Sequence, residues 1–273
     1  MNTYRRVSAG LAVGAVLAPL FLLAPGGATR RQRAPFMGVN FAHRGLHSRD
    51  KTVPENSVEA FRLAARAGYG IELDVQLSRD GEVVVFHDDT LERVCGVNKR
   101  VDEVDYAALS RMKLCGQHTA VPLLTEVLAV INGRGPLIVE LKTGRRNREL
   151  CEKTYALLEN YRGEVCVESF DPTIVAWFRL HGKDLVRGQL AMPASEYPAD
   201  MPGWKRFALS HCLFNCLSRP QFIAYKIGRR PFTVKLSEAL GAMRFGWTSH
   251  EPRSEQGRDG VIFEFYKPAV KYK

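Results

Sequence analysis

The segments FAHRG (residues 41–45) and GIELDVQLSRDGEVVVFHDD (residues 70–89) decide the fold and the chemistry expected of this chain. The first ends a short apolar strand, and the second contains a strand, a turn and a returning strand. Imidazole, guanidinium and carboxylate groups lie at the ends of these strands, where unpaired charge near an apolar core is costly. This mixture of groups suits a metal-assisted reaction on an anionic substrate.

A strand–helix–strand unit links the two segments. Strands over residues 37–42 and 70–75 flank a helix over residues 57–67, which predicts two parallel, neighbouring strands. We expect Asn56 to cap this helix, with Glu59 three residues later as in a capping box. The Asp80-Gly81 pair predicts a hairpin, so the chain returns antiparallel to the second strand and brings its histidine back towards the acids.

Strands and helices alternate along the rest of the chain. Apart from the hairpin strand, eight strands are expected, ending near His43, Asp74, Lys142, Phe170, Leu190, Tyr225, Thr248 and Glu264. Eight strands alternating with helices predict an α/β fold, the TIM (β/α)8 barrel. Residues 88–122 are predicted to be a small insertion after the hairpin that follows strand 2. Residues 249–259 are barely enough for a parallel crossover, so the last helix must be very short or absent.

Two further helices are expected over residues 204–217 and 235–243. The six cysteines form no CxxC pair and indicate no disulfide framework. The net charge is +10, but the basic residues are scattered rather than gathered in a stripe with interleaved aromatics. This distribution argues against nucleic-acid binding and leaves attraction to anionic lipid surfaces open. The oligomeric state cannot be read from the sequence.

The N-terminal stretch VSAGLAVGAVLAPLFLLAPGGA (residues 7–28) contains no charge and is long enough to span a bilayer. We expect a hydrophobic helix that anchors the chain in a membrane. Gly26 and Ala28 offer the alternative of a signal peptide, cleaved on secretion. The basic residues that follow favour a cytoplasmic catalytic domain. Residues 1–35 are thus expected to be an anchor or signal segment plus a linker (29–35), outside a barrel domain over residues 36–273.

The charged residues of the first three barrel strands are expected to converge, because the C-terminal strand ends of such a barrel share one face. Glu72 and Asp74 are two apart and point to the same side, and Glu140 and Lys142 repeat that spacing. Three carboxylates form a hard, oxygen-rich site that suits one divalent cation, Ca²⁺ or Mg²⁺. Arg44 and Lys142 can neutralise a phosphate.

Two histidines complete the set of groups that phosphodiester hydrolysis requires. His43 and His87 can act as base and acid near neutral pH. In the order of the chain, the motifs are HRG (43–45), PEN (54–56), ELD (72–74), HD (87–88), ELK (140–142), SF (169–170), WT (247–248) and GVIFE (260–264). Together they resemble the glycerophosphodiester phosphodiesterase family over about residues 41–268.

The resemblance implies a TIM barrel with a small insertion and an enzyme of glycerol and lipid metabolism. It implies hydrolysis of a small-molecule glycerophosphodiester to sn-glycerol 3-phosphate and an alcohol. The site residues it implies are His43 and His87 as the acid/base pair, Glu72, Asp74 and Glu140 as metal ligands, and Arg44 and Lys142 as phosphate contacts. We also expect Phe170 and Trp247 to line the glycerol pocket, although core packing is an equal alternative.

The chain departs from the family pattern at two places. Ser249 and His250 follow the WT strand, where the family often has Asn, and strand 8 ends in Phe263-Glu264 rather than Thr-Asp. Both departures could alter the alcohol side of the pocket or the closure of the barrel.

Two alternative functions remain at this point: a related TIM-barrel phospholipase acting on intact membrane lipid, and a non-catalytic barrel that binds phospholipid headgroups. The ELD and ELK motifs with the hairpin favour the phosphodiesterase. The alcohol headgroup, the choice of cation and the identity of the base stay open. Pro54, Glu55 and Asn56 are interpreted as mainly shaping the first loop, and His47 carries no motif.

Overall fold

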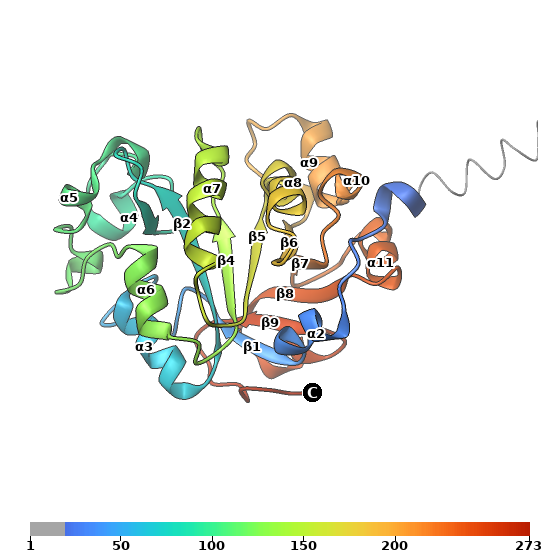
Figure 1. Cartoon of the computed structure of the whole chain (residues 1–273), viewed down its shortest axis with the longest axis horizontal. Coiled ribbons are helices and arrows are strands. Elements are labelled where there is room, and N and C mark those ends of the chain that lie inside the picture. Colours follow the sequence, from blue (N-terminus) through green and yellow to red (C-terminus); the bar gives the residue numbers. More distant parts are fainter. Residues whose placement is uncertain (1–19) are drawn as a thin grey trace, which may run out of the picture.

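The computed structural model describes residues 20–273 and shows a closed barrel of eight parallel strands (Figure 1). The strands are β1 (Val39–Ala42), β2 (Gly70–Leu77), β4 (Leu137–Leu141), β5 (Val165–Ser169), β6 (Val186–Ala191), β7 (Phe222–Lys226), β8 (Met243–Ser249) and β9 (Gly260–Phe263). Each strand pairs with the next in this order, and β1 pairs with both β2 and β9. The prediction of a TIM barrel is confirmed.

Helices surround the barrel and bury apolar faces against it. They are α3 (Val58–Ala67), α6 (Leu124–Ile131), α7 (Asn147–Leu158), α8 (Pro172–His181), α9 (Gly203–Ser210), α10 (Asn215–Ser218) and α11 (Phe232–Ala239). In α3, for example, Phe61 and Ala64 are fully buried. Between β8 and β9 lies only a 3₁₀ turn, η5 (Pro252–Glu255), so the expectation of a very short last helix is confirmed.

The hairpin and the segment after it stand beside the mouth of the barrel. Strand β3 (Val83–Val85) runs antiparallel to β2, with Val85 opposite Val75. Residues 88–122 then form α4 (Glu92–Cys95), η2 (Val101–Glu103), α5 (Tyr106–Leu109) and η3 (Leu114–Gly116). Leu91, Val101 and Leu109 are buried in an apolar cluster that the segment shares with Val84 and Phe86 of the hairpin. The segment and the hairpin therefore form an apolar cluster that is separate from those of the barrel.

Two expected helices have different bounds in the structure. The helix expected over residues 204–217 is divided into α9 and α10, because Cys212 adopts φ 50° and turns the chain. This turn buries the Cys212 thiol in a cluster with Ile223 and Val234. The helix expected over residues 235–243 is α11, which begins after Pro231 and ends before Gly241, whose φ is 117°.

The described part of the N-terminal segment packs on the barrel rather than lying outside the fold. Leu23 is buried, and its carbonyl accepts a hydrogen bond from Ser237 Oγ at 2.8 Å. The linker expected over residues 29–35 contains instead α2 (Arg30–Arg33), where Thr29 and Gln32 form a capping box, and the start of the 3₁₀ turn η1 (Ala34–Phe36). The membrane-helix prediction falls mainly on residues 1–19, outside the described residues. Among residues 20–273, no helix has the length and apolar character to cross a bilayer.

Gly188 of β6 leaves room for an aromatic ring inside the barrel. A Cβ atom at this position would lie 2.1 Å from ring atoms of Phe222, which is fully buried. We expect Gly188→Ala to lower the free energy of unfolding by about 1–3 kcal/mol through overpacking. Gly27→Ala is the matched control, because its Cβ would meet no described atom within 4 Å. Urea unfolding of both variants measures the difference, and equal stabilities would contradict this account of the barrel interior.

Candidate active site

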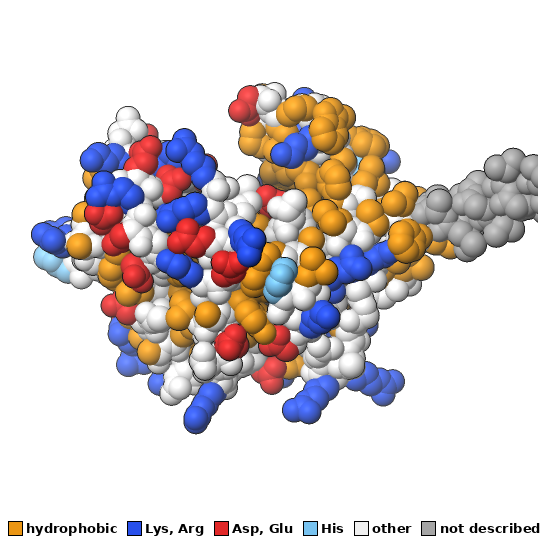
Figure 2. All heavy atoms as spheres, turned by 45° about the horizontal axis from the view of Figure 1, so that its top comes forward, with side chains coloured by type: hydrophobic (Ala, Val, Ile, Leu, Met, Phe, Trp, Pro, Cys, Tyr) orange, Lys and Arg blue, Asp and Glu red, His pale blue; other side chains and the backbone are white. Residues whose placement is uncertain are grey.

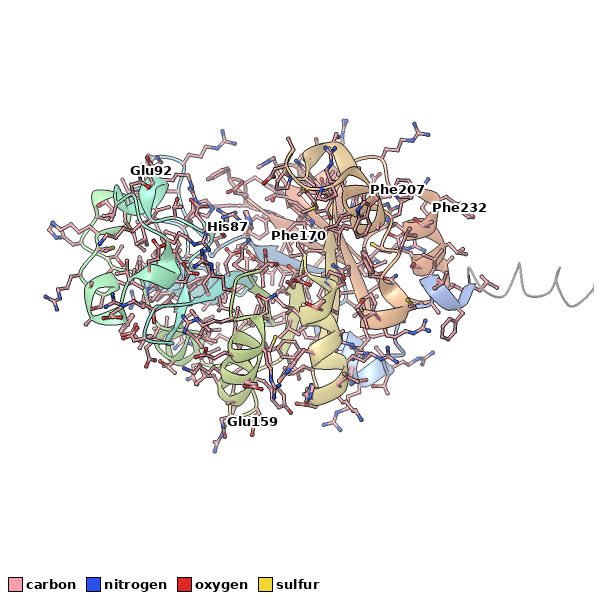
Figure 3. The ribbon with its side chains drawn as sticks, turned by 90° about the horizontal axis from the view of Figure 1, so that it is seen from above. His87, Glu92, Glu159, Phe170, Phe207 and Phe232 are labelled. Carbon is pink, nitrogen blue, oxygen red and sulfur yellow. The ribbon has the colours of Figure 1, made fainter. Side chains whose placement is uncertain are left out.

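A cavity of about 140 Å³ opens at the C-terminal ends of the barrel strands. It is lined by His43, Arg44, Glu72, His87, Glu140, Glu168, Phe170, Leu190, Trp247, Thr248 and Ile262. The predicted site residues all line this cavity except Asp74 and Lys142, which contact its lining residues directly. Seen from above the barrel, His87 and Phe170 lie near the middle of the molecule (Figure 3). The structure therefore brings together residues from strands that are far apart in sequence.

Three carboxylates form the floor of the site. Glu72 and Asp74 belong to β2, and Glu140 lies opposite Asp74 on β4. One oxygen from each of them lies within 4.8 Å of the other two, and all three side chains are buried. The predicted two-residue spacing thus places the three acids in one cluster.

The charges of these acids are strongly perturbed. Burial raises the pKa of Glu72 well above its ordinary value, and the charges of Asp74 and Glu140 raise it further. Burial likewise raises the pKa of Glu140. Burial acts in the same sense on Asp74, but the positive groups around it, among them His87 and Lys142, hold the pKa of Asp74 below its ordinary range.

The donor set of this cluster fits a hard divalent cation. Asp74 Oδ1 is buried and has no hydrogen-bond partner within residues 20–273. Carboxylate oxygens are the ligands that Ca²⁺ and Mg²⁺ prefer. A cation held by Glu72, Asp74 and Glu140 would also offset the repulsion from neighbouring acids that raises the pKa of Glu72.

Two cationic side chains flank the carboxylates. Lys142 Nζ lies 2.7 Å from Glu140 Oε1 and 3.5 Å from Asp74 Oδ1. Arg44 Nε lies 3.5 Å from Asp74 Oδ2, and the Arg44 backbone N–H donates to Glu72 Oε2 at 2.9 Å. Arg44 lines the cavity, and Lys142 contacts the lining residue Glu140.

Glu55 connects the first loop to the insertion. It lies 2.6 Å from both Arg44 and Arg93, and Arg93 also binds Asp88. Asp88 in turn lies 2.7 Å from His87 Nδ1. Burial of Glu55 is outweighed by Arg93 and Arg44, which lower its pKa to about 2. One chain of ion pairs therefore joins Arg44, a candidate phosphate contact, to His87, a candidate for the acid or the base.

Asn56 also belongs to the site rather than to the helix cap that the sequence suggested. Ser57 is the N-cap of α3, and its Oγ accepts a hydrogen bond from the Ala60 N–H. Asn56 adopts φ 52° and donates from Nδ2 to Asp74 Oδ2 at 2.8 Å. Asparagine tolerates this left-handed conformation better than most residues, so it can fix the orientation of Asp74.

His43 contacts an acid from the last strand. Its Nδ1 lies 3.5 Å from Glu264 Oε1, and His47 Nε2 lies 3.0 Å from the same oxygen. Burial lowers the pKa of His43 to about 4, although Glu264 opposes this shift. The imidazole of His43 is therefore neutral at physiological pH. His47, which had no motif, and Glu264, a departure from the family pattern, are thus part of the surroundings of this histidine.

Glu168 is a fourth buried acid that the sequence interpretation missed. It lies opposite Glu140 on β5 and lines the cavity. Burial raises the pKa of Glu168 well above its ordinary value, with the charge of Glu140 adding to the shift. The alternation of side chains along a strand could have indicated this residue in the sequence. Glu168 lies two residues before Phe170 and therefore faces the same side.

Phe170 and Trp247 form an apolar wall of the cavity. Their rings meet edge to face, with centroids 5.6 Å apart. Trp247 Nε1 donates to the Ala224 carbonyl at 3.0 Å, which holds the indole in place. Both residues therefore face the cavity rather than the core alone.

Comparison with known proteins agrees with this geometry. The model of the glycerophosphoryl diester phosphodiesterase family matches residues 43–266. A glycerophosphodiester phosphodiesterase of Bacillus altitudinis is 29% identical over 256 residues, which cover 85% of this chain and 97% of that protein. One from Caldanaerobacter subterraneus subsp. tengcongensis is 36% identical over 113 residues, covering 38% of this chain and 44% of that protein.

Solved structures share the fold. An Oleispira antarctica phosphodiesterase, solved in complex with the product sn-glycerol 3-phosphate, superposes with a TM-score of 0.69 at 22% identity, covering 85% of this chain and 94% of that one. At this identity the likeness shows the fold alone, whereas the family model covers most of the chain. The chain therefore belongs to the glycerophosphoryl diester phosphodiesterase family and is a phosphoric diester hydrolase.

Proposed function

We propose that the chain hydrolyses glycerophosphodiesters to sn-glycerol 3-phosphate and an alcohol with one divalent cation, Ca²⁺ or Mg²⁺, held by Glu72, Asp74 and Glu140. One observation carries this proposal: a buried, oxygen-rich cluster contributes Glu72 and Glu140 to the cavity that the two histidines line, and two cationic side chains lie beside the cluster. When bound, the cation would supply Lewis-acid polarisation of a phosphate oxygen.

Residues of the protein bind the phosphate and transfer the protons. Arg44 and Lys142 neutralise charge on the phosphate as the reaction proceeds. His43, neutral because of its burial, takes the proton from the nucleophile. His87, whose Nδ1 is held by Asp88, gives a proton to the leaving alcohol. Phe170 and Trp247 contact the carbon atoms of the substrate and keep water away from them.

We also propose that the uncharged run that begins at Val7 ties the enzyme to a membrane. The support is its length and composition, with Arg30, Arg31 and Arg33 following it in favour of a cytoplasmic catalytic domain. Secretion after cleavage of a signal peptide is the alternative. Fractionation of cells that produce the full chain separates the two.

Release of glycerol 3-phosphate from glycerophosphocholine tests the proposed reaction directly. With the full-length chain, we expect turnover with added Ca²⁺ or Mg²⁺, loss of turnover in EDTA and recovery when the cation is in excess. Turnover that survives EDTA would contradict the metal part of the proposal. Failure to hydrolyse any diester in a panel of headgroups, with either cation, would contradict the substrate class.

A further inference from the structure

A second group of candidate metal ligands surrounds His43. His43, His47 and Glu264 each offer one ligand atom, and these atoms all lie within 4.8 Å of one another. Glu264 Oε1 lies 3.5 Å from His43 Nδ1 and 3.0 Å from His47 Nε2. We call these three residues the histidine cluster. It shares no residue with the carboxylate cluster that is proposed to hold Ca²⁺ or Mg²⁺.

The backbone at the end of β1 brings the members of the histidine cluster together. Arg44 and Gly45 both adopt left-handed conformations, with φ of 53° and 80°, and turn the chain after His43. Glycine adopts such a conformation without steric cost. His47 therefore comes back towards His43, while Glu264 directly follows β9, the strand that pairs with β1 at the closure of the barrel. The three ligands are thus positioned by one tight turn and one pair of strands.

The contacts within the histidine cluster match the spacing of ligands around a single ion. Zinc in proteins is tetrahedral, with bonds of about 2.0–2.2 Å to nitrogen and oxygen, so two of its ligand atoms lie about 3.3 Å apart. The two distances to Glu264 Oε1 lie on either side of this value. Among residues 20–273, neither His43 Nδ1 nor His47 Nε2 has a hydrogen-bond partner, although both atoms are buried. The His47 side chain is only 8% exposed, and a buried polar atom without a partner is costly.

The donor atoms of the histidine cluster favour a transition metal over the cation of the carboxylate cluster. Two imidazoles and one carboxylate are a usual ligand set for Zn²⁺, whereas Ca²⁺ and Mg²⁺ take oxygen ligands. The side chains of His43 and Glu264 are 16% and 17% exposed, so the cluster is in contact with solvent. Figure 2 shows the surface hollowed at the barrel mouth, between the charged insertion and the apolar surface over α9 and α10. An ion can therefore reach the cluster from outside.

We propose that the histidine cluster binds one Zn²⁺ ion and that this ion inhibits the enzyme. The binding of zinc follows from the geometry of the three side chains alone, whereas the inhibition rests on the proposed function, in which His43 is the base. Neither His47 nor Glu264 lines the catalytic cavity, so the cluster adjoins this cavity through His43. A bound ion therefore acts on the reaction through one imidazole ring.

Zinc would fix the proton of His43 on the nitrogen that has to accept one. A neutral imidazole carries a single proton, and the nitrogen without it is the acceptor. His43 is neutral at physiological pH, and with its proton on Nδ1, towards Glu264, its Nε2 can take a proton from the nucleophile. With Nδ1 bound to zinc, the proton of the neutral ring is on Nε2, which then donates instead of accepting. The ring changes its tautomer without gaining or losing a proton, and it no longer acts as a base.

A zinc titration of the full-length enzyme tests the site and its effect together. Hydrolysis of glycerophosphocholine is measured with saturating Ca²⁺ or Mg²⁺ while the free Zn²⁺ concentration is raised. We expect a fall in kcat that additional Ca²⁺ or Mg²⁺ does not relieve. Relief by these cations would place the inhibitory zinc in the carboxylate cluster and overturn the proposal. Equilibrium dialysis under the same conditions counts the bound zinc ions.

Two variants connect the zinc to the histidine cluster. His47→Asn and Glu264→Gln each replace one ligand by a weakly coordinating amide. Partners that only orient a metal ligand are worth about 10–100-fold in affinity, so loss of a ligand should raise the zinc concentration for half-inhibition by about 100-fold or more. Each variant is compared with its own zinc-free rate, and dialysis should find one zinc ion fewer than in the wild type. His118→Asn, at an exposed position in the insertion, is the matched control and should match the wild type in both measurements.

The outcomes separate this inference from the proposed function. Equal zinc binding by the wild type and both variants would overturn the site. Zinc that is bound by the wild type and lost in both variants, but that leaves the wild-type rate unchanged, would overturn the inhibition. Hydrolysis of no diester in the absence of zinc would overturn the proposed function and the inhibition with it, and dialysis would then decide the site by itself.

Discussion

Replacement of His43 by Asn is expected to lower kcat on glycerophosphocholine by about 10²–10⁴-fold, the usual contribution of a positioned general acid or base. The structure gives the physical reason. His43 is neutral because burial lowers its pKa to about 4, and its Nδ1 faces Glu264. The other ring nitrogen can therefore accept a proton. Because Asn keeps much of the volume but cannot accept this proton, kcat should fall far more than KM rises.

The leaving group distinguishes the two histidines. A diester of p-nitrophenol needs no proton on its leaving oxygen, so His87→Asn should lose far less activity on this substrate than on glycerophosphocholine. His43→Asn should lose a similar factor on both. His118→Asn, at an exposed position in the insertion, is the control and should behave like the wild type. If the nitrophenyl diester instead restored the activity of His43→Asn, His43 would be the acid and His87 the base.

The parts of the site that follow from local periodicity could be predicted from sequence. Glu72 and Asp74, like Glu140 and Lys142, are two residues apart in apolar strands, so their shared side follows from the geometry of a strand. The rule that parallel strands of a barrel end at one face then brings the two pairs together. The hairpin at Asp80-Gly81 correctly placed His87 on the returning chain, where it reaches the cavity.

The contacts that depend on tertiary packing could not be predicted. Asparagine commonly caps helices, and only the folded loop shows that the amide of Asn56 reaches Asp74 instead. His47 meets Glu264 across more than two hundred residues of sequence, so no spacing relates them. In the same way, the turn at Cys212 depends on the cluster that buries its thiol, although its local sequence favours one continuous helix.

The burial of several carboxylates in one cluster is expected to make the cation-free protein less stable. Sites of this kind store strain that the rest of the fold must offset. Here the cost is visible in the raised pKa values of Glu72 and Glu168, because burial and the neighbouring acids disfavour the charged forms of both groups. Replacing one of these acids should therefore raise the stability of the cation-free protein and at the same time lower its activity.

Glu72→Gln is expected to stabilise the cation-free protein while lowering activity by about 10–100-fold or more. A carboxyl group whose folded pKa is raised contributes stability that is fully present below the unfolded pKa and is lost as the pH rises through the folded pKa. The variant's advantage in Tm, measured in EDTA, should therefore be small in acid and grow towards neutral pH.

The same variant should lose the stabilisation that the cation gives. For the wild type, a cation at one hundred times its Kd is expected to add about 2.7 kcal/mol to the free energy of unfolding. Thermal unfolding with and without Ca²⁺ or Mg²⁺ measures this gain in both proteins. Glu159→Gln, at an exposed position far from the site (Figure 3), should keep the full gain. Because the amide introduced by Glu72→Gln can still accept the hydrogen bond from the Arg44 N–H, a loss of the gain in this variant would be due to the charge alone, and an undiminished gain would show that Glu72 is not a ligand.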